Sequence, residues 1–200
     1  MVNLGYERIE ELLHALGAHL SEGGHSAGIV VVGGTSLAVM GWVERTTQDI
    51  DVIAQAIKEG EGWELVAPDP LPEPRVSAVA RMARDFGLPE DWLNTTIGAQ
   101  WGHGLPPRFA DEIEWRRYGA LHVGFAGRRA LIALKLYAAV DRGPSSMHVQ
   151  DLMALAPTDP ELDEGMEWVL TQDASEAFPS LVLEVVEHVR NASRRTRLSR

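Results

Sequence analysis

The sequence contains no cysteine, so disulfide bonds, thiolate metal sites and a cysteine nucleophile are all excluded. It also lacks any apolar run near the roughly 20 residues that a membrane-spanning helix needs. The first residues, 1–7, do not show the basic and then apolar layout of a secretory signal peptide. From these features we expect a cytoplasmic protein that does not enter a membrane.

Basic residues are few, with 18 Lys and Arg against 29 Asp and Glu, and the formal net charge is −11. Residues 190–200 hold five arginines and no acid, so the rest of the chain is more acidic still. An acidic body does not favour non-specific binding of nucleic acid. The basic end has two interpretations: a contact for RNA or a partner, or a solvated helix end whose arginines complement the helix dipole.

The remaining composition is that of a folded domain. Apolar residues make up 45% of the 200 residues and charged residues 24%, which excludes a wholly disordered chain. Periodicity predicts strands near 28–32, 50–53, 113–118 and 120–125. The predicted helices span 6–20, 35–43, 76–86, 128–140, 147–155, 160–170 and 175–191, and another begins at 88–93. Residues 66–74 hold four prolines and are expected to form a surface loop, and residues 98–107 are expected to be irregular.

Two glycines and two hydroxyl residues follow the first predicted strand. Gly33 and Gly34 let the backbone approach an anion closely, with amides free to donate. Thr35 and Ser36 add hydroxyl donors at a helix N-terminus, where the helix dipole favours phosphate. The pattern is typical of a loop that holds phosphate groups.

Two aspartates accompany the second predicted strand. Asp49 and Asp51 are two positions apart, so a strand presents both carboxylates on one face, with Ile50 and Val52 on the other. Two hard oxygen ligands side by side suit Mg²⁺, which completes its shell with water and substrate phosphate.

Taken together, Gly33-Gly34-Thr35, a short helix and then Arg45-x-Thr47-x-Asp49-x-Asp51 resemble the nucleotidyltransferase superfamily with its polymerase-β-like fold. More narrowly, the segment is similar to AbiEii/MenT-type toxin nucleotidyltransferases and their relatives of unknown substrate. Residues 83–94 and 130–139, and then Asp151, resemble further segments of those relatives, so the likeness covers residues 28–155.

The resemblance implies an α+β fold with an α/β-like core, in which a small mixed sheet is flanked by helices and followed by a helical extension. We expect residues 1–127 to form the nucleotidyltransferase core, and residues 128–200 to form a helical part packed on the same core. The implied reaction moves a nucleoside monophosphate from an NTP to an acceptor hydroxyl. The implied partners are tRNA as the acceptor and a cognate antitoxin.

The resemblance also assigns roles to residues. Asp49 and Asp51 are the metal ligands and, with Lys135, the catalytic residues. Lys135 neutralises the triphosphate as a point charge or is an ordinary helix lysine. The nucleotide-binding residues are Gly33, Gly34, Thr35, Ser36, Arg45, Lys135 and Asp151. Arg45 contacts the triphosphate, or pairs with Asp49 or a backbone carbonyl, and Asp151 orients Lys135 or acts as a local cap.

The chain departs from the family pattern in two places. His148 stands where relatives often have an aspartate, and the strand over 120–125 has His122 but no third carboxylate. These departures leave open a second metal ion and a general base from that strand. They also leave open a degenerate nucleotide-binding regulatory module, and the acidic body leaves open a cationic small molecule, or a protein, as acceptor.

Several other residues have two interpretations each. Trp92, Trp101 and Trp115 either stack on a base or belong to the core. His103 lies in a glycine-flanked loop that either covers a site or is plain surface. An apolar stripe near the C-terminus either docks a partner or packs within the chain, and comprises Val182, Val185, Val186 and Val189.

Overall fold

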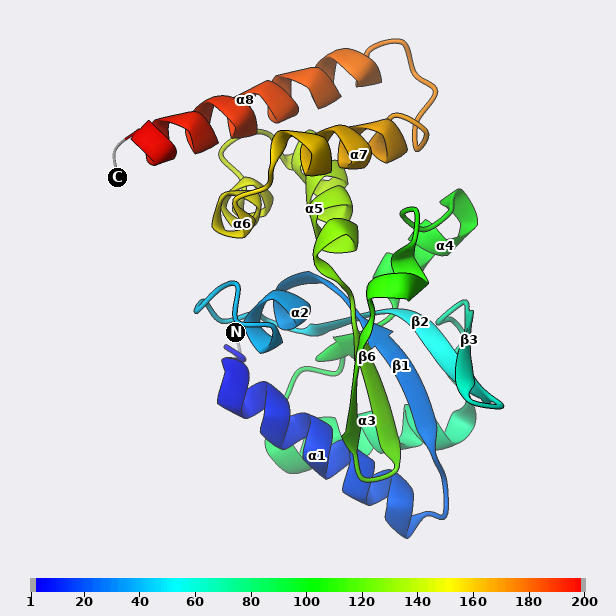
Figure 1. Cartoon of the computed structure of the whole chain (residues 1–200). Coiled ribbons are helices and arrows are strands. Elements are labelled where there is room, and N and C mark those ends of the chain that lie inside the picture. The colour runs from blue at the N-terminus through cyan, green and yellow to red at the C-terminus, as the bar shows by residue number, and fades with distance from the viewer. Residues whose placement is uncertain (1–2, 199–200) are drawn as a thin grey trace. The chain divides into compact units, whose positions relative to one another are not determined.

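The computed structural model describes residues 3–198, with side chains to Arg195 (Figure 1). The chain divides into two compact units, which are described separately below. The sheet unit contains residues 3–105 and 113–126, and the helical unit contains residues 106–112 and 127–198. The predicted domain boundary at 127/128, with the second part packed on the first, stays a prediction.

The sheet unit is built on six strands: β1 (Ala27–Val31), β2 (Ile50–Glu59), β3 (Gly62–Val66), β4 (Leu93–Asn94), β5 (Glu114–Tyr118) and β6 (Leu121–Phe125). Their order is β3-β2-β1-β6-β5, and β4 pairs with β2 beside this path. The β1–β6 and β2–β4 pairs are parallel, whereas the other neighbours are antiparallel. The small mixed sheet flanked by helices that the sequence predicts is therefore confirmed.

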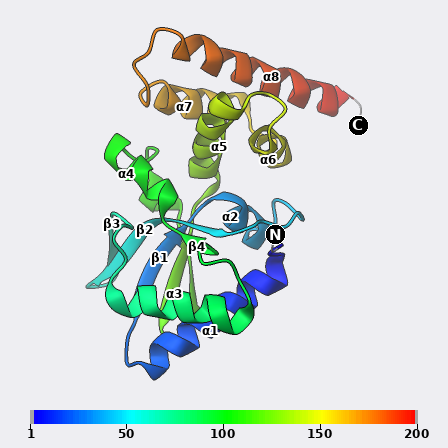
Figure 2. The same ribbon diagram turned by 180° about the vertical axis from the view of Figure 1, so that it is seen from behind.

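Two helices, α1 (Tyr6–Glu22) and α3 (Glu73–Phe86), cover one face of this sheet (Figure 2). Their apolar residues form one buried cluster with alternate residues of the strands, including Ile29 and Val31 of β1 and Val123 of β6. Because side chains alternate along a strand, Gly28, Val30 and His122 lie on the other face. The shorter elements of this unit are α2 (Gly33–Val39), η1 (Thr96–Ala99) and α4 (Gln100–His103).

Three expectations for the sheet unit were wrong in detail. No helix begins at 88–93, because Trp92 O accepts a hydrogen bond from Ile50 N at 2.7 Å and Leu93–Asn94 then pairs with β2 as β4. β2 continues to Glu59, and an edge strand that the sequence analysis missed, β3, pairs with it. α2 ends at Val39 rather than at 43, just before Gly41 takes a φ of +73°.

The helical unit comprises η2 (Phe109–Glu112), α5 (Arg128–Arg142), α6 (Met147–Leu155), α7 (Asp159–Val169) and α8 (Phe178–Leu198). The four predicted helices of this region are confirmed. The valine stripe of α8 is at most 3% exposed and packs within the unit, as its simpler interpretation predicted. Arg190 of the basic end pairs with Asp163 and Glu187, and the side chains of residues 197 and 200 lie outside the described residues.

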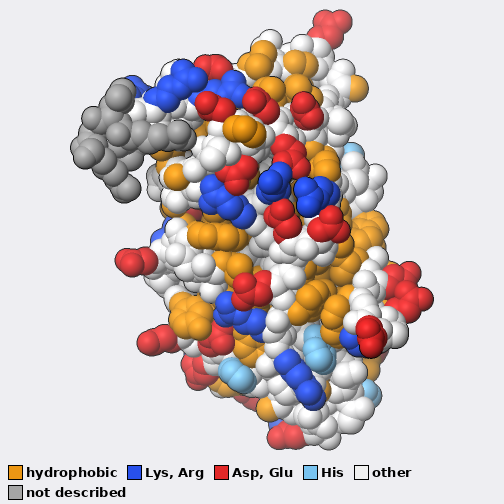
Figure 3. Space-filling view, in the orientation of Figure 1, with side chains coloured by type: hydrophobic (Ala, Val, Ile, Leu, Met, Phe, Trp, Pro, Cys, Tyr) orange, Lys and Arg blue, Asp and Glu red, His pale blue; other side chains and the backbone are white. Residues whose placement is uncertain are grey.

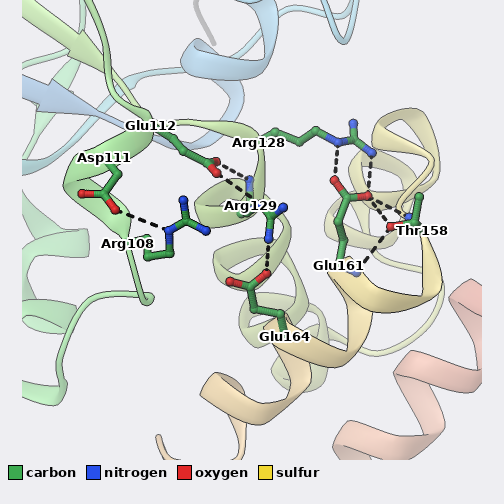
Figure 4. A network of polar contacts seen from close by, with 8 residues as sticks. All are labelled: Arg108, Asp111, Glu112, Arg128, Arg129, Thr158, Glu161 and Glu164. Carbon is green, nitrogen blue, oxygen red and sulfur yellow. Dashed lines mark hydrogen bonds and ion pairs between the residues drawn. The ribbon is translucent and has the colours of Figure 1, made fainter.

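A polar network ties together the helical unit (Figure 4). Glu161 accepts hydrogen bonds from Arg128 Nε at 2.7 Å and from the backbone N–H of Thr158 at 2.8 Å, which closes a capping box at the start of α7. Arg129 Nη1 lies 2.5 Å from Glu164, and Arg129 Nε lies 3.2 Å from Glu112 of η2. These charges are therefore paired with one another and hold three elements in place.

Candidate active site

The glycine turn and the acidic strand fit against each other residue by residue. Gly33 has a φ of +69°, and a Cβ at this position would collide with the Asp51 carboxylate. A Cβ on Gly34 would lie 2.7 Å from Thr47 Oγ1 and 3.5 Å from Arg45 Nη1. The glycines are needed because both halves of the motif make close contact there. This contact brings Gly33, Gly34, Arg45 and Asp51 together.

The hydroxyl groups of Thr35 and Ser36 are buried and already donate within the protein. Thr35 Oγ1 donates to Asp49 O at 3.0 Å, and Ser36 Oγ donates to Val31 O at 2.7 Å. Thr47 Oγ1 also reaches Asp49 O, at 3.4 Å. A hydroxyl has one hydrogen to donate, so in this arrangement Thr35 and Ser36 do not offer their hydroxyl hydrogens to a phosphate. Thr35 fixes the backbone at Asp49, and Ser36 fixes the backbone at Val31.

Asp49 and Asp51 converge on a third residue that the sequence analysis did not find. Asp49 lies just before β2, and Asp51 lies within it. Asn94 pairs with Asp51 across the β4–β2 bridge, and its Nδ2 donates to Asp49 Oδ2 at 3.0 Å and to Asp51 Oδ1 at 3.3 Å. The side-chain oxygen of Asn94, Oδ1, accepts a hydrogen bond from Thr96 N at 3.2 Å, and this bond orients the side-chain amide. The two carboxylates therefore face a single donor.

The crowding of negative charge changes the acidity of this pair. The pKa of Asp49 is raised to about 6, first by partial burial and then by repulsion from Asp51 and Asp91. The hydrogen bond from Asn94 opposes this shift. A carboxyl group whose pKa is raised by burial and by neighbouring like charges is a marker of functional sites. Asp49 is therefore a candidate functional residue.

Lys135 and Asp151 form an ion pair inside the helical unit. Lys135 Nζ on α5 lies 2.7 Å from Asp151 Oδ2 on α6, and both side chains are buried. The predicted contact between them is therefore present, while the predicted role of Lys135 at the triphosphate stays a prediction. His148 lies half-buried on α6, three residues before Asp151.

The other aromatic and histidine candidates lie in different surroundings. Trp92 is fully buried and its indole N–H donates to Val79 O at 3.1 Å, so it is a core residue. Trp115 stacks on Trp63, and His122 lies beside that pair. The remaining two, Trp101 and His103, belong to the short helix α4.

Asp49 and Asp51 are not joined by a third His, Asp or Glu side chain of the kind that binds a metal ion among the residues that the structure describes. Within residues 3–198, no group of three or more His, Asp or Glu side chains is placed to hold a metal ion. Any divalent cation at Asp49 and Asp51 would therefore take its remaining ligands from water, backbone or substrate.

The described helices are too short or too polar to cross a bilayer.

A comparison with protein-family models supports the nucleotide-related interpretation. Residues 7–62 match a family described as nucleotidyltransferase of unknown function (DUF6036). No curated protein and no solved structure matches the chain. The matched region contains α1, β1, α2 and β2, and with them the glycine turn and both aspartates. This match supports a place in the nucleotidyltransferase superfamily.

Proposed function

We propose that the protein is a Mg²⁺-dependent nucleotidyltransferase that moves a nucleoside monophosphate from an NTP to an acceptor hydroxyl. The observation that carries the proposal is the convergence of Asp49 and Asp51 on the Asn94 amide beside the glycine turn. The family-model match over the same residues supports the transferase class.

The donor chemistry of the site fits Mg²⁺. Two carboxylates that share one hydrogen-bond donor present hard oxygen atoms toward one place. The pKa of Asp49 is raised by burial and then by repulsion from Asp51 and Asp91. Bound there, Mg²⁺ would offset the charge that builds on the phosphoryl oxygens. Asp49 and Asp51 would be its ligands, and Asn94 would orient them.

The proposal assigns the binding of the phosphates and the neutralisation of their charge to other residues of the chain. In the proposal, the backbone at Gly33 and Gly34 holds the phosphates and Thr35 and Ser36 keep that backbone in place through their buried hydrogen bonds. The acceptor oxygen attacks the α-phosphorus, the bond to the β-phosphate oxygen breaks, pyrophosphate leaves and the hydroxyl proton passes to solvent. Lys135, oriented by Asp151, is proposed to neutralise the triphosphate.

For the acceptor we propose tRNA, with the protein acting as the toxin of a pair that a cognate antitoxin controls. This part rests on the resemblance to AbiEii/MenT-type enzymes. A cationic small molecule or a protein remains the alternative acceptor, since the net charge of −11 favours a cation.

A second candidate function is a nucleotide-binding regulatory module without turnover. It is favoured by one observation, that no third carboxylate joins Asp49 and Asp51 among residues 3–198. Such a module would bind Mg·NTP at the same residues and transfer nothing.

The test is incubation with each α-labelled NTP, Mg²⁺ and total tRNA, and in parallel with an aminoglycoside and with protein. The proposal expects label in an acceptor with the natural protein, and none with Asp49→Asn/Asp51→Asn. A matched control is Asp85→Asn. It removes a carboxylate that forms an exposed ion pair with Arg81 on α3, and it should leave transfer unchanged. If the double variant transferred as much label as the natural protein, the proposal would be wrong.

A further inference from the structure

A cluster of aromatic side chains lies on the sheet face opposite α1 and α3. Trp63 of β3 and Trp115 of β5 come from the two outer strands of the five-strand path, yet their rings stack with centroids 4.7 Å apart. His122 of β6 lies 5.0 Å from the Trp63 ring. We call these three residues, with Lys58 and Arg117, the aromatic platform.

The platform exists because the central strands carry very small residues. A Cβ on Gly124 would lie 3.1 Å from the Trp115 ring, and a Cβ on Gly28 would strike the backbone of Ala56. The small residues leave room for the two indoles to reach across the sheet from both sides. Beside them is a hollow of about 340 Å³, lined by residues that include Gly28, Trp63 and His122. Both tryptophans keep part of their surface exposed, unlike the fully buried Trp92.

The charged side chains of the platform are cationic, although Asp51 lies farther along the same face and Arg116 lies on the opposite one. Lys58 Nζ lies 4.8 Å from the Trp63 ring centroid, and Lys58 and Arg117 are both exposed. The pKa of His122 is lowered by burial and then by the cationic charges of Arg117 and Lys58. Acidic residues alternate with the platform residues along the chain and therefore point to the opposite face, namely Glu59, Glu64 and Glu114.

Figure 3 shows hydrophobic side chains gathered over the sheet, toward the lower right, with histidine and cationic side chains beside them and acidic side chains at the edge. In a chain with a net charge of −11, a cationic face with aromatic rings is a local exception. Aromatic rings and cations on one surface are typical of sites that bind single-stranded nucleic acid, because bases stack on the rings and phosphates contact the cations.

We propose that the aromatic platform binds single-stranded nucleic acid. Unpaired bases pack against the parts of the Trp63–Trp115 stack that remain exposed, since the facing sides of the two rings already contact each other. The backbone phosphates lie against Lys58 and Arg117. A duplex is a poor ligand, because its bases are already stacked and paired.

The β1–β2 register shifts between Val30 and Val31, which interrupts the alternation along β2. As a result Asp51 lies on the same sheet face as Ala56, roughly 15 Å away along β2. A nucleic-acid strand bound to the platform can therefore extend along the sheet toward the carboxylates. Only this link to the carboxylates rests on the proposed function.

The test is titration of fluorophore-labelled oligouridylate with the full-length protein, followed by anisotropy, without NTP or Mg²⁺. Trp63→Leu and Trp115→Leu should each weaken binding about tenfold or more. Lys58→Gln should flatten the slope of log K against log salt by about 0.7, because one phosphate contact is lost. Lys58 is exposed, so this variant tests the proposal even where a tryptophan variant fails to fold.

Two matched controls should bind like the natural protein. Arg81→Gln removes one positive charge from α3, which covers the other face, and Trp101→Leu removes a tryptophan outside the platform. The proposal is overturned if oligouridylate does not bind, or if Lys58→Gln and Arg81→Gln have the same salt slope. It is equally overturned if a duplex binds as tightly, or if oligoglutamate of equal charge displaces the oligonucleotide.

The outcome is separable from that of the proposed function. Asp51→Asn should bind oligouridylate as the natural protein does, because its carboxylate is not part of the platform. Oligonucleotide binding without label transfer would overturn the proposed function alone, whereas label transfer without platform-dependent binding would overturn this inference alone.

Discussion

In the sheet unit, Asp49 lies beside Asp51 and its pKa is raised to about 6. In the helical unit, Glu161 lies against Arg128 and Thr158 and its pKa is lowered to about 2. Both are part-buried carboxylates of one acidic chain, yet repulsion from Asp51 adds to the cost of burying Asp49, whereas a guanidinium and two hydrogen-bond donors satisfy Glu161. The difference separates a carboxylate that the protein stabilises from one whose ionised form the protein disfavours, and our proposal assigns the second to the binding of a cation.

Removing the satisfied carboxylate should have the largest effect on stability. Glu161→Ala deletes the ion pair with Arg128 and the capping box at α7, and should lower the free energy of unfolding by about 3 kcal/mol. Chemical denaturation at neutral pH measures this. Because the folded pKa is depressed, the stabilisation is present above about pH 4.5 and is lost as the pH falls toward about 2. A pH-independent difference between the two proteins would contradict the account.

The next effect tests the contact between the glycine turn and Asp51. Gly33→Ala and Gly87→Ala both place a side chain at positive φ, with φ values of +69° and +62°, and each should cost about 1–2 kcal/mol. Only the Cβ at position 33 meets Asp51, while the space around Gly87 is open. Gly33→Ala should therefore also weaken Mg·NTP binding by about tenfold or more, and Gly87→Ala should not. Calorimetric titration compares them, and equal affinities would show that the contact with Gly33 does not position Asp51.

Neutralising Asp49, whose pKa is raised, should stabilise the protein. Asp49→Asn removes the repulsion from Asp51 and Asp91 and should raise the free energy of unfolding by about 1 kcal/mol above pH 6, after allowance for solvent screening. The folded pKa is raised, so the natural protein gains stability as the pH falls through about 6 and the advantage of the variant disappears. Thermal melts without metal measure this. A variant less stable than the natural protein at neutral pH would break the comparison with Glu161.

The smallest effect belongs to an exposed pair in the same network as Glu161. Glu164→Gln removes the partner of Arg129, whose side chain is 44% exposed. Exposed ion pairs contribute little, so the change should be about 0.5 kcal/mol or less. A loss as large as that of Glu161→Ala would show that the capping box is not what distinguishes Glu161.

The order and spacing of Gly33 through Asp51 were enough to single out the two segments of the candidate site, which the structure brings into contact. Its parts lie within 20 residues, and local rules for strands and helix starts apply to them. Asn94 was missed because it reaches the site through a two-residue parallel bridge to β2, and such a long-range pairing leaves no periodic signal. The flanking Pro89-Glu90-Asp91 also favours a helix start, and this local preference was overridden by the burial of Trp92.

Only part of the aromatic platform could be predicted from the sequence, for a similar reason. Trp115 and His122 lie on a predicted hairpin and were considered as site residues. Trp63 lies on the short edge strand β3, which has too few alternating residues to be recognised, and it meets Trp115 only once the sheet order is known.

The most direct test of the central claim is titration of the protein and its Asp51→Asn variant with Mg·NTP in an isothermal calorimeter, with Asp85→Asn as the control. The account predicts that the natural protein and Asp85→Asn bind Mg·NTP, and that removing either Mg²⁺ or the Asp51 carboxylate abolishes the binding. Binding that is equally strong in Asp51→Asn, or equally strong without Mg²⁺, would contradict the assignment of Asp49 and Asp51 as the metal and nucleotide site.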